Sequence, residues 1–239
     1  MYAFFHSLGG SGAGSPPLTN LWGWWHAGEV YSDTACTVRQ TTNGGSIAGL
    51  LDLSGNSRNL TQATGANQPV LDTTLNGIDF DGTNDFFTRS GPAMPFTFYI
   101  VVEFDLWTAN RSLLTHTNGV SSISTWQGGS SPQVGIFNGA STGALVSATL
   151  GSKRLVGVSY DSVAALGTLI IDSTSATVGS LSNVPASPFY LGSTHVGSGY
   201  LNGKISEFLI YTGVHTFGSG DGLLARQYLN VKYNLGLGI

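Results

Sequence analysis

The sequence predicts an all-β protein, a sandwich or jelly roll that carries an extended N-terminal arm and one C-terminal helix. Between residues 96 and 171, short apolar runs alternate with Gly-, Ser- and Asn-rich loops. This is the pattern of short strands joined by turns. Residues 200–211, YLNGKISEFLIY, place apolar side chains on both parities of one run. Such a run is expected of a central strand that is buried on both of its faces.

The composition is that of a folded chain with a charge-poor surface. Of the 239 residues, 41% are hydrophobic and 9% are charged, and the net charge is −4. A substantial core is possible at this length, and all-β sandwiches of about 200–250 residues form single domains. Lys and Arg are scattered along the chain, so nucleic acid is not an expected partner. Cys36 is the single cysteine, which excludes an intramolecular disulfide, and we expect a small, buried apolar residue there.

The first residues do not read as a targeting segment. Residues 1–8, MYAFFHSL, lack a basic region and have too short an apolar run for a secretory signal peptide. No stretch approaches the ~18 apolar residues of a membrane span. We therefore expect a protein without a secretion signal of its own and without a membrane partner.

Residues 1–20 are predicted to be an arm and linker, and residues 21–239 the jelly-roll domain. The arm has an apolar tip, Tyr2, Phe4 and Phe5, on a Gly/Ser tether that ends in Pro-Pro. Termini are ordered when something holds them down. The tip is therefore predicted to dock on a neighbouring subunit or partner protein, with folding back onto its own domain as the alternative.

The domain opens on residues 21–25, LWGWW, which we interpret as core or interface packing in preference to a ligand platform. Residues 52–56 read as a strand end that runs into a turn. Residues 77–80 and 86–87 flank a turn at residues 81–85, which predicts a hairpin. Further strands are expected at residues 96–104, 113–114, 133–137, 144–150, 153–160, 167–171 and 189–193.

Residues 223–233 are the one convincing helix. Asp221 is the expected N-cap and Gly236 the expected stop. Leu224, Tyr228 and Val231 recur at helical spacing, so we expect them to form the buried face.

A set of short motifs occurs in a familiar order. These are DLSGNSRNLTQ (52–62), QP (68–69), NGIDFDGTND (76–85), FYLGS (189–193), GKISEFLIY (203–211) and RQYLNVKY (226–233). Together they resemble the concanavalin A-like lectin/glucanase superfamily in its laminin-G-like branch, over residues 21–237. A Trp that often precedes the first motif is replaced here by Leu50 and Leu51, which would move a core aromatic elsewhere, such as to residues 22–25.

The resemblance implies two packed antiparallel sheets in a jelly roll with a curved face. It also implies a carbohydrate- or protein-binding module, of a kind that also occurs in phage virion proteins.

Catalysis is not expected. Glucanases of the superfamily cluster carboxylates on one strand, where alternate positions share a face. Glu103 and Asp105 share a face here, but no third acid follows. Glu207 is alone on its strand, so we expect a structural role, paired with a cation such as Arg226 or accepting backbone N–H groups. The five His lack metal-ligand spacing, so zinc is not expected.

Calcium is the metal that the sequence allows. Asp79, Asp81, Asn84 and Asp85 crowd one turn and offer the oxygen ligands that a hard cation prefers. Asp and Asn are also ordinary turn formers, and the turn-only interpretation is favoured.

A sugar site would need an aromatic ring with amide and hydroxyl neighbours. Trp107 and Trp126 lie in loop-like sequence, with Asn110 and Gln127 close by. These four residues are the candidate ligand-binding set. The alternative is that each Trp covers a sheet edge or a subunit interface.

The function that we expect is a non-catalytic structural or interaction protein of a particle surface. The arm, the charge-poor surface, the missing secretion signal and the isolated module favour a phage virion decoration, head-fibre or tail-accessory protein. It would be attached through the arm to other virion proteins as a homo-oligomer. The alternative is an extracellular carbohydrate-binding lectin module that recognises a glycan or a host surface.

Overall fold

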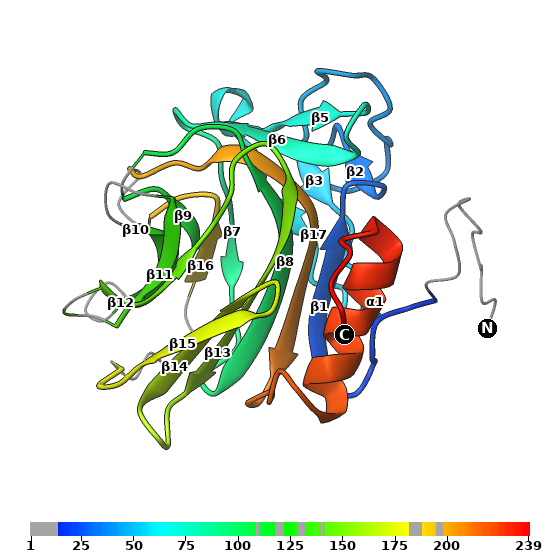
Figure 1. The fold of residues 1–239 in the computed structure, drawn as a ribbon. Helices are drawn as coiled ribbons and strands as arrows, with labels where there is room; N and C mark the ends of the chain where they lie inside the picture. Colours follow the sequence, from blue (N-terminus) through cyan, green and yellow to red (C-terminus); the bar gives the residue numbers. More distant parts are fainter. Residues whose placement is uncertain are drawn as a thin grey trace.

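The computed structural model describes residues 14–108, 110–117, 122–128, 132–138, 140, 142–181, 188–194 and 198–239. The arm tip, Tyr2, Phe4 and Phe5, lies outside these residues. Two antiparallel sheets form a sandwich with one α-helix at the C-terminal end (Figure 1). The all-β class, the sandwich and the single C-terminal helix are therefore confirmed. None of the helices in the described part of the chain is long and apolar enough to cross a membrane.

The first sheet has eight strands. In spatial order they are β15 (Thr174–Val178), β14 (Leu166–Ile171), β13 (Lys153–Asp161), β8 (Phe96–Phe104), β17 (Asn202–Thr212), β6 (Gly77–Asp81) and β5 (Val70–Asp72), with β1 (Leu21–His26) also paired to β17.

The second sheet has nine strands. Their order is β12 (Thr142–Ser147), β11 (Gln133–Phe137), β10 (Ser122–Gly128), β9 (Ser112–Thr117), β16 (Pro188–Leu191), β7 (Phe87–Ser90), β4 (Leu60–Thr61), β3 (Gly49–Leu50) and β2 (Val30–Tyr31). A 3-10 turn, η1 (Gly65–Asn67), precedes β5.

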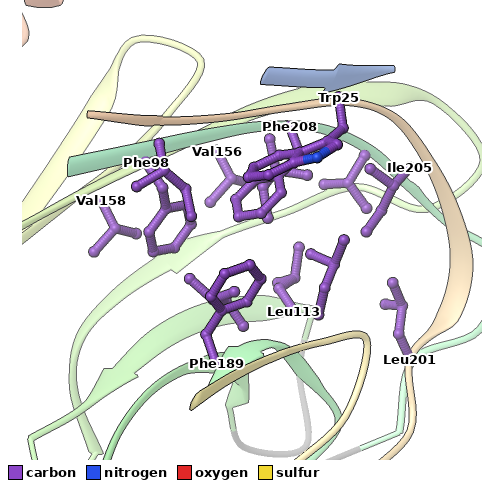
Figure 2. Close-up of a cluster of buried hydrophobic side chains, with 14 of the residues drawn as sticks. Trp25, Phe98, Leu113, Val156, Val158, Phe189, Leu201, Ile205 and Phe208 are labelled. Carbon is purple, nitrogen blue, oxygen red and sulfur yellow. The ribbon is translucent and has the colours of Figure 1, made fainter. Parts of the chain in front are cut away.

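The main core lies between the two sheets and is rich in aromatic rings (Figure 2). Trp25 of β1 is 1% exposed and stacks on Phe208 of β17, with ring centroids 5.2 Å apart. Phe189 of β16 meets Phe208 from the other sheet at 5.9 Å. The LWGWW run alternates between buried and half-buried positions, so the core interpretation holds for Trp25. Trp25 is also the core aromatic that the missing Trp before the first motif led us to expect in this run.

The turn motif at residues 52–56 fastens β1 to the body. The Asp52 carboxylate accepts hydrogen bonds from the backbone N–H groups of Trp24, Ser54 and Arg58, at 2.8–3.1 Å. The Arg58 carbonyl in turn accepts the indole N–H of Trp25 at 3.0 Å. The motif therefore has a structural role: its side chains replace a strand ladder as partners for otherwise orphaned backbone donors.

Helix α1 (Gly220–Tyr233) covers the outer face of the eight-stranded sheet and buries a second, smaller core. Its buried side chains include Ala225, Tyr228 and Leu229, whereas Leu224 and Val231 are about half exposed. The predicted face is therefore right for Tyr228 and wrong for Leu224 and Val231. The N-cap is Ser219 and not Asp221, and the helix ends at Asn234 in the left-handed region, two residues before Gly236.

One local expectation at the strands also fails. The predicted hairpin at residues 77–87 does not form, because β6 belongs to one sheet and β7 to the other. In β17, a bulge between Ile205 and Glu207 changes the parity. It places Ile205 in the same core as Phe208 and Ile210, opposite to Leu209. A bulge inserts one extra residue into a strand, so the side chains before it point to the opposite face from the one that simple alternation would give them.

Glu207, the one glutamate of β17, fixes helix α1 to the eight-stranded sheet. Glu207 is fully buried and accepts hydrogen bonds from the Trp24 indole (2.6 Å) and from the hydroxyls of Tyr228 (2.8 Å) and Tyr233 (2.7 Å). Lys232 supplies the ion pair at 2.7 Å. Burial, and then the Glu207 carboxylate, raise the pKa of both tyrosines, which keeps their hydroxyls as donors. The structural role is as expected, but the cation is Lys232 and not Arg226.

A buried histidine predicts acid sensitivity. His116 of β9 is 1% exposed and lies against Phe96. Burial lowers the pKa of His116 to about 4, although the Pro92 carbonyl opposes the shift. The unfolded value is about 6.5, so the unfolded chain binds the proton more readily. The contribution of the neutral His116 to stability is therefore complete above pH ~6.5. As the pH falls from 6.5 towards 4, the free energy of unfolding decreases by at most about 3 kcal/mol.

The measurement is urea unfolding at neutral pH and at about pH 4. We expect His116→Gln to lose less stability on acidification than the wild-type chain. Asp85 provides the opposite control, because burial raises the pKa of its carboxyl to about 6. The contribution of Asp85 to stability is present below the carboxyl pKa of the unfolded chain and is lost as the pH rises through 6. In the wild-type chain it offsets part of the stability that is lost on acidification, so Asp85→Asn should make that loss larger. An unchanged pH dependence in His116→Gln would show that this histidine is not responsible.

Candidate functional site

The two sheets differ in what covers their outer faces. Helix α1 is the one α-helix in the described chain, and it packs on the eight-stranded sheet. Figure 1 shows it on that side, away from β9 to β12. The outer face of the nine-stranded sheet therefore has no described helix over it. Aromatic side chains lie on this face of the sheet.

Cross-strand pairing shows which side chains share that face, since directly paired residues point the same way. The inward set on β9, β11 and β16 includes Leu114, Ile136 and Phe189, all in the main core. The opposite parity forms one row across the whole sheet, which we call the outward row. Its members, in spatial order, are Tyr31, Gly49, Thr61, Thr88, Tyr190, Thr115, Ser124, Phe137 and Thr142.

Two aromatic pairs stand at the outward row. Trp126 of β10 lies beside Phe137 of β11, with ring centroids 5.3 Å apart. Phe86, just before β7, lies beside Tyr190 of β16 at 6.1 Å. All four side chains are half-buried, so each keeps part of its ring at the surface. Aromatic rings of this kind present flat apolar area at little cost in conformational entropy.

Hydroxyl groups lie between the two pairs. The Ser112 and Thr115 hydroxyls are 2.8 Å apart, and those of Thr115 and Ser124 are 2.9 Å apart. These three side chains are buried and satisfy one another, so they form a polar floor. Thr88 and Thr61 continue the row on the Tyr190 side and are half-buried. The sheet thus carries half-buried rings at two places, and the hydroxyls on the line that joins them are buried and bond one another.

Strand alternation determines where Trp126 points. The register between β9 and β10 shifts between Thr125 and Trp126. Thr125 faces inward and hydrogen-bonds the Tyr160 hydroxyl at 2.9 Å, so Trp126 faces outward opposite Gly135. The prediction that Trp126 lies in a loop is wrong. Its place on a strand makes it a more rigid platform than a loop would.

The structure separates the other sequence candidates from Trp126. Trp107 packs edge-on against Phe104, with centroids 5.6 Å apart, and adjoins the main core. Gln127 is fully buried, and its side-chain amide bonds the Leu106 carbonyl and the Thr108 N–H at 3.3 and 3.4 Å. Asn110 is exposed, and its N–H bonds the Gln127 carbonyl at 3.0 Å. Gln127 therefore holds the loop before β9 in place.

Sequence reasoning missed Phe86, Phe137, Tyr190 and Thr115. Whether these residues belong to the candidate site depends on which alternate side chains of each strand face outward. Alternation within residues 133–137 carries part of that signal, because Val134 and Ile136 are the inward residues. The register between strands distant in the chain, such as β9 with β16, is not readable from local sequence.

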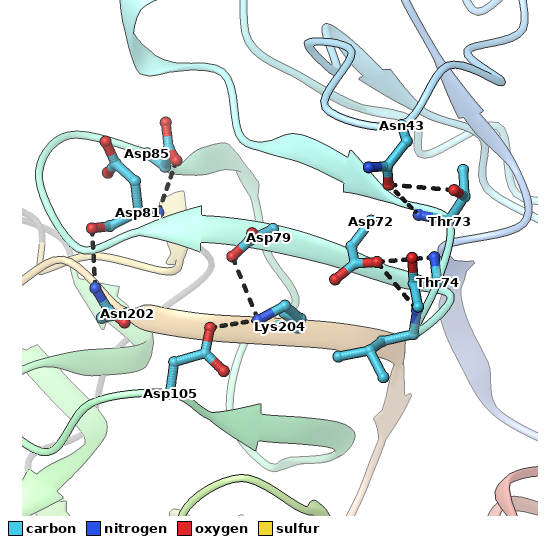
Figure 3. Close-up of polar contacts among 11 residues, drawn as sticks. Asn43, Asp72, Thr73, Thr74, Asp79, Asp81, Asp85, Asp105, Asn202 and Lys204 are labelled. Atoms are coloured by element: carbon cyan, nitrogen blue, oxygen red, sulfur yellow. Dashed lines mark hydrogen bonds and ion pairs between the residues drawn. The ribbon is translucent and has the colours of Figure 1, made fainter.

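The calcium candidates form a hydrogen-bonded turn at the end of β6 (Figure 3). Asp81 accepts the N–H groups of Thr83 and Asn84 at 2.7 and 3.4 Å. Asp85 accepts the N–H of Asp81 at 2.9 Å. Asp79 lies 4.0 Å from the Lys204 ammonium. In the part of the chain that the structure describes, no group of three or more His, Cys, Asp or Glu is placed to hold a metal.

The Glu103 and Asp105 carboxylates lie near the same lysine. Lys204 pairs with Asp105 as well as with Asp79, and its strand position is directly opposite Glu103. Burial raises the pKa of Asp79, although Lys204 opposes it. An ammonium group therefore stands among these acids (Figure 3). Asp79 and Asp105 therefore form a charge-compensated cluster with Lys204.

The described chain is a two-sheet jelly-roll-like sandwich with a helix on one of its sheets, and solved structures of similar fold include sugar-active proteins. No family model and no curated protein matches the sequence. A Trypanosoma rangeli sialidase in complex with sialic acid is similar at a TM-score of 0.57 and 15% identity, over 90% of this chain and 33% of that chain. Its complex with 2,3-difluoro-KDN gives a TM-score of 0.60 at 14% identity, over 88% and 32%. The chain spans about a third of the length of these sialidases.

Domain 4 of AbnA, a GH43 extracellular arabinanase from Geobacillus stearothermophilus, in complex with arabinotriose, is similar over most of its own length. The TM-score is 0.51 at 14% identity, over 73% of this chain and 91% of that chain. At identities this low, the likeness concerns the fold. It does not carry the residues of a site from one protein to the other.

Proposed function

We propose that the protein is a non-catalytic carbohydrate-binding module of the concanavalin A-like group, and that the glycan lies on the outward row. The observation that carries the proposal is the placement of two aromatic pairs, Trp126–Phe137 and Phe86–Tyr190, around a line of hydroxyls on the uncovered sheet. A sugar has apolar C–H faces that pack on rings and hydroxyls that bond neutral polar groups. The two aromatic pairs supply the rings for the first of these contacts.

Two further observations support this proposal. Domain 4 of AbnA, which has the same kind of fold and nearly the same extent, is seen with arabinotriose. The acids that could serve hydrolysis are grouped around Lys204, where Asp79 and Asp105 pair with the ammonium. We therefore propose that the protein binds a glycan without cleaving it. Such a module would act outside the cell, where polymeric glycans are found.

The virion interpretation remains a prediction. Its main evidence was the apolar tip, Tyr2, Phe4 and Phe5, which lies outside the described residues. Attachment to a particle and assembly into a homo-oligomer both depend on that arm. The uncovered sheet supports the carbohydrate alternative independently of it.

The test is binding to a glycan array, followed by calorimetry with the glycans that bind. We expect Trp126→Ala to weaken binding about tenfold or more, because a central ring of a binding surface is worth more than about 1.4 kcal/mol. Trp126→Phe keeps a ring and should retain part of the affinity. Trp107→Ala is the matched control, since Trp107 adjoins the interior, and should leave the affinity within about twofold.

Thermal unfolding of each variant separates lost binding from lost folding. If Trp107→Ala abolished binding in a folded protein while Trp126→Ala did not, the site would lie at the loop before β9. A wild-type chain that bound no glycan would refute the proposal.

A further inference from the structure

The charges around the outward row limit which glycan it accepts. The strands of the nine-stranded sheet contain a single residue among Lys, Arg, Asp and Glu, which is Arg89 of β7. Arg89 pairs with the inward Phe189, and its guanidinium donates to the Asn59 carbonyl at 2.7 Å. The segments that join β9, β10, β11 and β12, residues 118–121, 129–132 and 138–141, contain no such residue in the sequence. Residues 179–187, before β16, contain none either.

The other guanidinium groups near this sheet are already engaged. Arg111, just before β9, donates to the Gly82 carbonyl at 2.8 Å. Arg39 forms a β-bridge with Tyr31, which lies at the far end of the row, four strands beyond Tyr190. It pairs there with Glu29 at 3.2 Å. No described cation is therefore free beside either aromatic pair.

A charged sugar would bind weakly to a face without free cations. A carboxylate that leaves water needs a cation or several donors aimed at it, and otherwise the lost hydration weakens binding. An uncharged sugar needs no such cation and can rest on ring contacts, which the two aromatic pairs offer. The chemistry of the face therefore discriminates between glycans by charge.

The spacing of the aromatic pairs limits the length of the ligand. Phe137 and Tyr190 lie on strands separated by β10 and β9, with Ser124 and Thr115 between them in the row. Three strand spacings amount to about 14 Å. A single sugar ring cannot reach both pairs. A short chain that crosses the strands can rest on one pair at each end and pass over the hydroxyls between them.

We infer that the ligand of the outward row is an uncharged oligosaccharide that crosses the strands from the Trp126–Phe137 pair to the Phe86–Tyr190 pair. This inference rests on the proposed function and narrows it. It separates the protein from binders of acidic sugars, even though sialidase structures share its fold. It also makes Tyr190 a second determinant of affinity at a distance from Trp126.

The experiment is calorimetric titration of the full chain with two sets of probes. The neutral set comprises arabino-, xylo- and gluco-oligosaccharides from the monosaccharide upward, and the acidic set comprises sialyllactose and oligogalacturonates. We expect binding to a neutral series, affinity that rises with chain length, and no loss of affinity at high salt, since no ion pair forms. Tyr190→Ala should weaken binding of the longest chain about tenfold, and Tyr190→Phe much less.

The outcomes separate this inference from the function on which it rests. Binding confined to the acidic probes and weakened by salt, yet still lost in Trp126→Ala, would overturn the inference and leave the proposed function standing. Affinity equal for the monosaccharide and the longer chains, with Tyr190→Ala unaffected, would overturn the crossing geometry. Absence of binding to every probe would overturn both proposals.

Discussion

Glu207→Gln is expected to lower the free energy of unfolding by about 3 kcal/mol, because a buried charge and its donors lose their common partner. Glu207 is fully buried and accepts hydrogen bonds from Trp24, Tyr228 and Tyr233, besides its ion pair with Lys232. The glutamine has nearly the same shape but turns an N–H₂ group towards groups that are themselves donors. The ammonium is left without its counter-charge. Urea unfolding monitored by tryptophan fluorescence measures the change.

Glu29→Gln is the matched control. Glu29 also pairs with a cation, Arg39, at 3.2 Å and accepts a tyrosine hydroxyl, that of Tyr31, at 3.0 Å. Its side chain and that of Arg39 remain partly exposed to solvent. Water can replace the lost partners there, so the change should be below about 1 kcal/mol. Equal costs at the two sites would mean that burial of Glu207 does not determine the effect.

Trp25→Ala is expected to destabilise the sandwich by about 3–5 kcal/mol, the range found for removal of a buried aromatic ring. Trp25 is 1% exposed and touches rings from both sheets, Phe208 at 5.2 Å and Phe189 at 6.4 Å. The substitution leaves a cavity between the sheets. It also leaves the Arg58 carbonyl without its indole donor. Thermal and urea unfolding measure the loss.

Trp22→Ala, three positions earlier on the same strand, is the comparison. Trp22 is half-buried and lies under the Arg58 guanidinium at 4.4 Å. Less area leaves water there on folding, so the cost should be about 1–2 kcal/mol. Equal costs for Trp22→Ala and Trp25→Ala would mean that the deeper burial of Trp25 does not determine the effect.

The sequence predicted well wherever apolar periodicity alone decides the structure. The strand at residues 96–104 agrees with β8, and that at 133–137 agrees with β11. It failed where a tertiary contact decides. The chain crosses between sheets after residue 81, although the local turn signal favours a hairpin. The helix buries Ala225 and Leu229 because the sheet beneath it determines which face is covered.

The candidate site was predictable only in part. Trp126 was found because an aromatic with polar neighbours is conspicuous, but it was placed in a loop and grouped with Trp107. The ring faces outward because the preceding residue, Thr125, faces the core and bonds the Tyr160 hydroxyl of the other sheet. Tyr190 joins the same face through a strand that comes more than 60 residues later in the chain. Local sequence carries no record of that register.

The most direct test of the account is to map a bound neutral oligosaccharide on the protein by NMR chemical-shift perturbation. We predict that the perturbed amides lie along the outward row, around Ser124, Trp126, Phe137 and Tyr190, and that those of α1 do not respond. Perturbations centred on α1, or on the turn at residues 81–85, would place the ligand elsewhere and contradict the account.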